Sequence, residues 1–282
     1  MELLLIHTGG TIGMAETPEG LAPKAGLVED ALTARLPQTV TLKSHVFSPL
    51  LDSADVGPQH WNTMLDAIRS HPQASVIITH GTDTMAFTGA ALSQALAGEN
   101  RKVVLCGSMV PLGHEGDAEG NLDLAIATAL GNDPGIHLAF AGKVMEAGGL
   151  VKHNSHDVEA FRAQPQDPLH PPQSLRFDTT RKLAILTLSP GMPADAVEAI
   201  VSKLDGAVLR LFGSGTAMND PALISVLAAA VSAGKRLRGV SQCEAGGLQP
   251  GSYAAGAGLW GAGVENGGRQ TPEAALIHLW LN

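Results

Sequence analysis

Cysteine, tyrosine and positive charge are all scarce in this chain of 282 residues. Its two cysteines, Cys106 and Cys243, are too few for a secreted disulfide framework and lack the paired spacing of a zinc or redox site. Lysine and arginine number 18 against 27 acidic residues, and the resulting net charge of −9 repels the phosphate backbones of nucleic acids. We therefore expect a reduced cytoplasmic location and no nucleic-acid partner.

Long hydrophobic runs and a signal segment are also missing. The amino terminus has no basic start and no small-residue cleavage site, and no apolar run is long enough to span a membrane, so we expect no membrane partner. With 44% hydrophobic and 16% charged residues, the composition excludes a disordered chain, collagen and a coiled coil. The length allows one large domain or two modest ones, each with its own core.

Short apolar runs flanked by turn residues indicate strands that are covered on both faces. Such runs occupy residues 3–6, 74–79, 102–105 and 136–140 in the first half, and 183–188 and 207–212 in the second. Helical spacing of apolar residues predicts intervening helices over 58–68, 84–96 and 220–233, and a last helix from about Thr271. This alternation of strands and helices predicts an α/β fold with a largely parallel sheet.

A segment dense in proline divides the two sets of predicted strands. It contains Pro165, Pro168, Pro171 and Pro172, a density that neither a helix nor an interior strand tolerates. We therefore predict a larger N-terminal catalytic α/β domain over residues 1–165, a proline-rich linker over 166–181, and a smaller C-terminal α/β domain over 182–282.

The polar residues that follow each predicted strand are the first candidates for a site, because ligands bind at the carboxyl ends of parallel strands. Residues 7–13, HTGGTIG, follow the first strand but match neither GxGxxG nor the GK[ST] ending of nucleotide loops. Two interpretations stay open here. The segment is either a glycine turn with capping threonines or a turn that presents a hydroxyl nucleophile.

Residues 80–84, HGTDT, follow the second predicted strand and precede the helix expected near Met85. Thr82 or Asp83 could simply cap that helix. Alternatively, the helix amino terminus favours a bound carboxylate or a developing oxyanion, with Thr82 as a hydroxyl beside an acidic partner.

A threonine nucleophile requires a nearby base, and Lys152 is the candidate, although a loop lysine is ordinarily a solvated charge. Ser53 could contact a ligand, or Ser53 or Asp55 could cap the helix that starts near Pro58. Ser108, after another predicted strand, could line the same pocket or belong to an ordinary turn.

Metal and serine-hydrolase signatures are not found. No HExxH or comparable pair of ligands and no GxSxG elbow is present, so we expect no metal site. The histidines of the candidate segments are expected to make local hydrogen bonds; they are His7, His80, His114, His153 and His156.

Taken together, these segments resemble the bacterial-type L-asparaginase family, in its cytoplasmic branch. The similarity extends in order over nearly the whole chain. The residues that carry it are Thr8-Gly9-Gly10-Thr11-Ile12, Asp52-Ser53, His80-Gly81-Thr82-Asp83-Thr84, Lys152, Val158-Glu159-Ala160-Phe161, Phe212-Gly213-Ser214-Gly215-Thr216, Ser241-Gln242-Cys243 and Thr271-Pro272-Glu273-Ala274-Ala275.

The resemblance implies an amidohydrolase that converts L-asparagine and water to L-aspartate and ammonia without a metal or organic cofactor. It implies Thr11 as the nucleophile, with Thr82, Asp83 and Lys152 as the group that moves the proton. It further implies that the substrate is held by a set of residues from the same segments, which are Gly10, Asp52, Ser53, Gly81, Thr82, Asp83 and, through a backbone carbonyl, Ser108. A homodimer or homotetramer is implied as well.

One position departs from the family pattern. Leu21 stands where the family usually has a tyrosine on the loop after the first threonine motif, and the only tyrosine of the chain is Tyr253. Two alternatives to an asparaginase follow: an amidase of mixed asparagine and glutamine specificity, and an amino-acid-binding sensor with weak activity. A subunit that feeds ammonia to a tRNA amidotransferase is disfavoured, because 282 residues leave no room for an appended domain.

Overall fold

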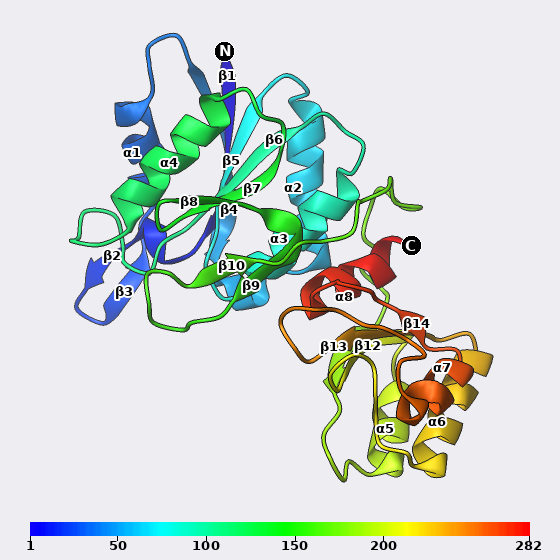
Figure 1. Ribbon diagram of the computed structural model, residues 1–282. Coiled ribbons are helices and arrows are strands. Elements are labelled where there is room, and N and C mark those ends of the chain that lie inside the picture. The colour runs from blue at the N-terminus through cyan, green and yellow to red at the C-terminus, as the bar shows by residue number, and fades with distance from the viewer. The chain divides into compact units, whose positions relative to one another are not determined.

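The computed structural model describes residues 1–282, which divide into two compact units, Met1–Ala163 and Gln164–Asn282 (Figure 1). No helix in either unit has the length and apolar character needed to cross a membrane. Each unit has its own sheet and its own hydrophobic core.

The N-terminal unit is built on a six-stranded sheet in the order β4-β1-β5-β6-β7-β8. All neighbouring strands are parallel except the last pair, in which β8 runs antiparallel to β7. The strands are β1 (Glu2–Gly9), β4 (Thr41–Leu51), β5 (Ser75–Thr79), β6 (Lys102–Cys106), β7 (Gly135–Phe140) and β8 (Lys143–Glu146).

Helices cover both faces of this sheet. Leu3 and Leu5 of β1 share a buried cluster with Val28 and Leu32 of α1 and Leu122 of α4. Figure 1 shows α2 and α3 on the side of the strands away from α1 and α4. The helices are α1 (Leu27–Arg35), α2 (Pro58–Ser70), α3 (Met85–Ala95) and α4 (Ala118–Leu130), with short 3-10 turns η1 (Thr11–Gly13), η2 (Ser53–Asp55) and η3 (Ala147–Gly149).

Two antiparallel pairs complete the N-terminal unit. The hairpin of β2 (Met14–Thr17) and β3 (Gly20–Pro23) follows η1, and β9 (Leu150–Lys152) pairs with β10 (Phe161–Ala163). In the second pair, Lys152 lies opposite Phe161 at the end of β9.

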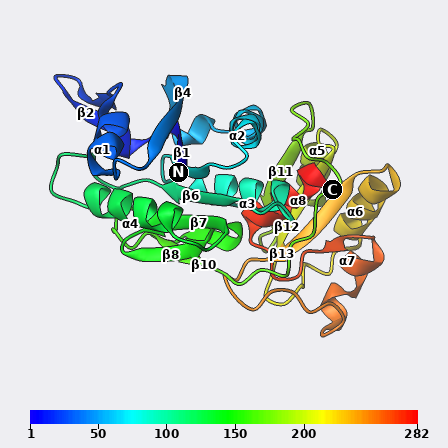
Figure 2. The same ribbon diagram turned by 90° about the horizontal axis from the view of Figure 1, so that it is seen from above.

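The C-terminal unit has a parallel four-stranded sheet in the order β11-β12-β13-β14. Figure 2 shows α8 on one side of this sheet and α6 and α7 on the other. Its elements are β11 (Leu183–Thr187), α5 (Ala194–Val201), β12 (Gly206–Leu211), α6 (Pro221–Ser232), β13 (Arg236–Ser241), η4 (Ala254–Gly256), α7 (Ala257–Gly261), β14 (Glu265–Asn266) and α8 (Pro272–Leu281).

The α/β fold with a mostly parallel covered sheet and a smaller α/β unit is confirmed, and so are the six predicted strands. The four predicted helices are confirmed as α2, α3, α6 and α8. Residues 166–181 contain neither helix nor strand and belong to the C-terminal unit. The domain boundaries drawn around that segment stay a prediction.

Candidate active site

Two candidate loops leave the sheet from adjacent strands. β1 and β5 pair in parallel with His7 opposite Thr79. The loop that contains Thr11 and the loop that contains Thr82 therefore both start at the carboxyl ends of the strands. The Thr8 hydroxyl donates a hydrogen bond to the Thr79 carbonyl at 3.0 Å, which ties the two strand ends together. The sheet therefore presents both threonine segments on one side.

The two loops touch through their glycines. A Cβ added at Gly10 would lie 2.4 Å from the Gly81 nitrogen and 2.6 Å from the Gly81 Cα. Gly10 also has a φ of +87°, a region that side chains with a Cβ rarely adopt. Gly10 directly precedes Thr11 and Gly81 directly precedes Thr82, so the contact brings the backbones that carry the two hydroxyls together.

Ser53 joins this contact from a third segment. Its side chain is buried, and a Cβ added at Gly81 would lie 2.8 Å from the Ser53 Oγ. The Thr84 hydroxyl donates to the Ser53 carbonyl at 2.5 Å and so fixes the segment against the second loop. Ser53 thus lies beside the backbone that leads to Thr82 and Asp83.

The residues that cap η2 and precede α2 differ from the capping candidates that the sequence offered. The Asp52 carboxylate accepts a hydrogen bond from the Ala54 N–H at 2.9 Å and caps η2, whereas the residue before α2 is Gly57. Capping of α2 by Ser53 or Asp55 is therefore wrong. Asp52 makes the bend that follows β4, and this contact gives its carboxylate a structural role.

Capping of α3 by Thr82 or Asp83 is also wrong. Thr84 is the residue that precedes the helix, and no side chain caps it. The Phe87 N–H donates to the Thr84 carbonyl at 3.0 Å, whereas the N–H groups of Met85 and Ala86 at the positive end of the helix dipole stay available to an anion.

Lys152 lies against both residues of the HGTDT segment that the sequence singled out. Its ammonium Nζ is 2.9 Å from the Thr82 Oγ1 and 2.5 Å from the Asp83 Oδ1. The Lys152 side chain is only 16% exposed, whereas that of Asp83 is 70% exposed. A mostly covered amine thus meets a hydroxyl on one side and a carboxylate open to ligands on the other.

The packing of α3 accounts for the position of Lys152. The helix contacts η3 and β9, the short elements that precede this lysine, so the end of β9 reaches the start of α3. Pairing of Lys152 with Phe161 of β10 anchors the backbone at that point. Sequence alone places Lys152 some 70 residues from Thr82, and only this packing joins them.

Ser108 is buried in a loop that is organised by residues which the sequence analysis missed. The Asp117 carboxylate accepts hydrogen bonds from the Met109 N–H at 2.9 Å and the Val110 N–H at 3.0 Å. The Asn121 side chain donates to the Gly107 carbonyl at 2.9 Å. The available signal was an acidic residue directly before a helix, whose carboxylate in this chain holds the preceding loop instead of capping its own helix.

Burial keeps the ionisable groups beneath the loops uncharged. It lowers the pKa of His80 to about 4, and it lowers the pKa of His7 against the opposing charge of Glu29. Burial likewise raises the pKa of the Cys106 thiol to about 12, which excludes it as a thiolate nucleophile at neutral pH. No group of three histidine, cysteine, aspartate or glutamate side chains is placed to hold a metal ion.

Leu21 lies on β3 opposite Glu16, and its side chain is 50% exposed. The β2–β3 hairpin therefore presents an apolar group at the position where a phenol was expected. Tyr253 lies in the C-terminal unit and is exposed.

Comparisons with known proteins cover the whole chain. A family model described as "Asparaginase, N-terminal" matches residues 2–182, and one described as "Glutaminase/Asparaginase C-terminal domain" matches residues 182–282. L-asparaginase 1 of Escherichia coli is 29% identical over 98% of this chain and 90% of its own length. L-asparaginase of Thermococcus kodakarensis is 30% identical over 99% of this chain and 92% of its own length. The solved structure of the thermostable L-asparaginase from Thermococcus kodakarensis aligns with a TM-score of 0.87 at 29% identity, covering 100% of this chain and 92% of that chain.

We expect Gly10→Ala to destabilise the N-terminal unit by about 1–3 kcal/mol more than Gly142→Ala, because only at Gly10 would the new Cβ overlap backbone atoms. Gly142 is the matched control, since it also has a positive φ but open space around the added atom. Calorimetric unfolding of the two variants measures the difference. Equal destabilisation would mean that the two loops do not constrain each other.

We also expect the N-terminal unit to lose stability as the pH falls from 6.5 to 4. The unfolded chain takes up a proton on His80 near pH 6.5, whereas the folded chain does so only near pH 4. The shift corresponds to a loss on the order of 3 kcal/mol, and His7 acts in the same direction. Urea titrations at several pH values measure the slope, which His80→Asn should flatten; an unchanged slope in that variant contradicts the assignment to His80.

Proposed function

This chain belongs to the asparaginase family, and we propose that it hydrolyses L-asparagine to L-aspartate and ammonia with Thr11 as the nucleophile. The observation that carries the proposal is the pair of contacts from the Lys152 ammonium to the Thr82 hydroxyl and the Asp83 carboxylate. The contact between Gly10 and Gly81 supports a position of Thr11 beside this group.

The substrate is a small zwitterion, and each of its charges finds a complementary group. The exposed Asp83 carboxylate pairs with the α-ammonium group. Ser53 and the uncapped start of α3 hydrogen-bond the α-carboxylate. Gly10, Gly81 and Asp52 shape the backbone around these contacts, and the Ser108 carbonyl accepts a hydrogen bond from the side-chain amide nitrogen.

In the first half of the reaction, the Thr11 Oγ attacks the side-chain amide carbon. The Lys152 ammonium first releases a proton to solvent; the Thr11 proton then passes through the Thr82 hydroxyl to the resulting amine, and the carbonyl electrons move onto oxygen. The oxyanion then collapses, the C–N bond breaks, and ammonia leaves after the nitrogen takes up that proton. An ester between Thr11 and the aspartyl group remains.

In the second half, water attacks the ester carbon and transfers a proton along the same path. The C–O bond to Thr11 breaks, the threonine recovers its proton, and L-aspartate is released. Asp83 stabilises the ammonium form of Lys152 in both halves because its carboxylate is in direct contact with Nζ. All of these groups belong to the polypeptide, and we propose that no metal or organic cofactor takes part.

Further properties of this enzyme are proposed with it. We infer a cytoplasmic protein that forms a homodimer or homotetramer, and L-glutamine as a possible second substrate of the same pocket. The leucine at position 21 favours one other candidate function, an amino-acid sensor that binds asparagine with little turnover. Ammonia release in proportion to asparagine consumed distinguishes the enzyme from the sensor.

We expect Thr11→Ala and Lys152→Met each to lower asparagine turnover at least about a hundredfold, because one removes the nucleophile and the other the proton acceptor. A coupled ammonia assay measures turnover. Lys143→Met is the matched control, since Lys143 makes an exposed ion pair with Glu159 and should leave turnover unchanged. Near-normal hydrolysis by Thr11→Ala would refute the nucleophile.

Leu21→Tyr should raise turnover several-fold, because a phenol hydroxyl on the β2–β3 hairpin would add a hydrogen-bonding partner for Thr11. Leu21→Phe is the control, because it adds the ring without the hydroxyl. Steady-state kinetics with asparagine compare the three proteins. If tyrosine and phenylalanine give the same turnover, the hairpin does not supply a group for activation.

A further inference from the structure

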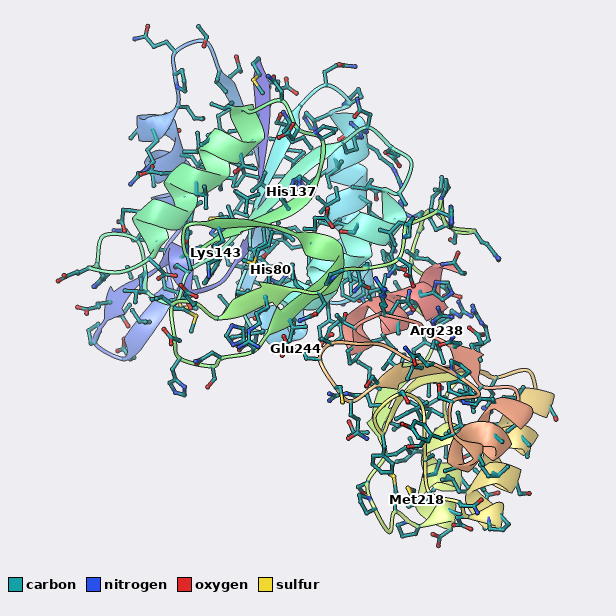
Figure 3. The ribbon with its side chains drawn as sticks, in the orientation of Figure 1. His80, His137, Lys143, Met218, Arg238 and Glu244 are labelled. Carbon is teal, nitrogen blue, oxygen red and sulfur yellow. The ribbon has the colours of Figure 1, made fainter.

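Three buried side chains form a continuous hydrogen-bonded line beneath the second threonine loop. The Trp61 Nε1 of α2 is 3.0 Å from the Thr88 Oγ1 of α3, and the same hydroxyl is 2.9 Å from the Nε2 of His80. The His80 Nδ1 is 2.7 Å from the Gly81 carbonyl oxygen. Figure 3 shows His80 inside the N-terminal unit, where its side chain is fully buried.

The chemistry of these groups permits only one direction for the line. The Gly81 carbonyl can only accept, so a neutral His80 carries its proton on Nδ1 and donates it there. Nε2 then accepts the Thr88 hydroxyl proton, and the Thr88 oxygen accepts from the Trp61 indole N–H. Because burial lowers the pKa of His80 to about 4, the ring stays neutral at neutral pH and the order of donors is preserved.

The last hydrogen bond fixes a peptide group that belongs to the site. The Gly81 carbonyl and the Thr82 N–H are part of one planar trans peptide, so they point in opposite directions. Holding the carbonyl toward the buried imidazole turns the Thr82 N–H away from it, toward the side where the loops meet. This N–H donates to no acceptor within the chain.

We propose that Trp61, Thr88 and His80 are positioning residues that orient the Gly81–Thr82 peptide, so that the Thr82 N–H donates to the oxyanion formed on the substrate. The inference rests on the proposed function, because it assigns a donor to the intermediate of that reaction. The three side chains lie behind the peptide and touch no substrate.

Such an arrangement prepares the donor before the reaction begins. A preorganised N–H stabilises the developing charge without a rearrangement at that moment. If the Thr88 hydroxyl is removed, the buried Nε2 lone pair of His80 loses its hydrogen-bond donor. The imidazole is then no longer held in the position from which Nδ1–H donates to the Gly81 carbonyl, and the peptide loses the contact that fixes its orientation.

The experiment compares Thr88→Val, which is nearly isosteric but has no hydroxyl, with Thr88→Ser, which keeps it. We expect Thr88→Val to lower kcat for asparagine at least about tenfold and to change KM less than about threefold, since the contacts to the substrate charges remain. Thr88→Ser should recover kcat to within about threefold of the original protein. Trp61→Phe should lower kcat in the same way, because the Thr88 hydroxyl then loses one of the two hydrogen bonds that hold it in place.

The nitrogen-15 chemical shifts of the histidine rings report protonation and hydrogen bonding at each ring nitrogen. A simple loss of packing at Thr88 would not change them in the same way. The original protein and Thr88→Ser should show His80 with its proton on Nδ1 and with Nε2 accepting a hydrogen bond, and Thr88→Val should show the resonance of an Nε2 that accepts none. Thr128→Val is the matched control, because Thr128 lies inside α4 and its hydroxyl only bonds the Leu124 carbonyl of the same helix. This control should leave kcat and the His80 tautomer unchanged.

Two results would overturn the inference: a proton on Nε2 of His80 in the original protein, or an unchanged kcat in Thr88→Val once its Nε2 has lost the hydrogen bond. Both are distinguishable from failure of the proposed function. That failure would appear as absent ammonia release by the original protein, or as a Thr11→Ala variant that is fully active.

Discussion

The close approach of the Gly10 and Gly81 backbones is the constraint on which the rest of the site depends. A side chain at Gly10 would overlap the Gly81 backbone and force apart the loops that carry Thr11 and Thr82, and a side chain at Gly81 would collide with Ser53. Parallel pairing of β1 and β5 brings the loops to the same edge, but pairing alone leaves their ends free. The glycine contact removes this freedom and admits Ser53 from a third segment.

Around this contact, the exposed groups are placed to meet the substrate and the buried groups hold the backbone. Asp83 carries charge at the surface of the second loop, where a polar substrate can reach the carboxylate, and Lys152 of β9 meets it from a mostly covered position. His80 and its partners are uncharged and enclosed, and they hold the backbone of the same loop from behind. The loop is consequently rigid on its inner side and open to ligands on its outer side.

Much of the fold could be predicted because β1, β5 and β6 are buried on both faces and leave uninterrupted apolar runs in the sequence. The edge strand β4 gives no such run, since exposed residues alternate with partly covered ones along it. The candidate residues could be proposed from motifs and family resemblance. The contacts of Lys152 could not, because they depend on packing between segments some 70 residues apart that local patterns do not encode. The contacts of Asp52 and Asp117 are local, but an acidic residue near a helix or bend does not by itself show which N–H groups it will accept from. His80 was expected to make a local hydrogen bond, and it does, but its connection through Thr88 to Trp61 spans two helices.

A crystal structure with L-aspartate bound tests the central claim most directly, because the product retains both charged α-groups and the carbon that is attacked. The account predicts that the α-ammonium lies against Asp83, the α-carboxylate against Ser53, and the side-chain carboxylate within hydrogen-bonding distance of the Thr11 hydroxyl and the Thr82 N–H. Aspartate bound elsewhere, or a Thr11 hydroxyl turned away from Lys152 and Thr82 in the occupied site, would contradict it.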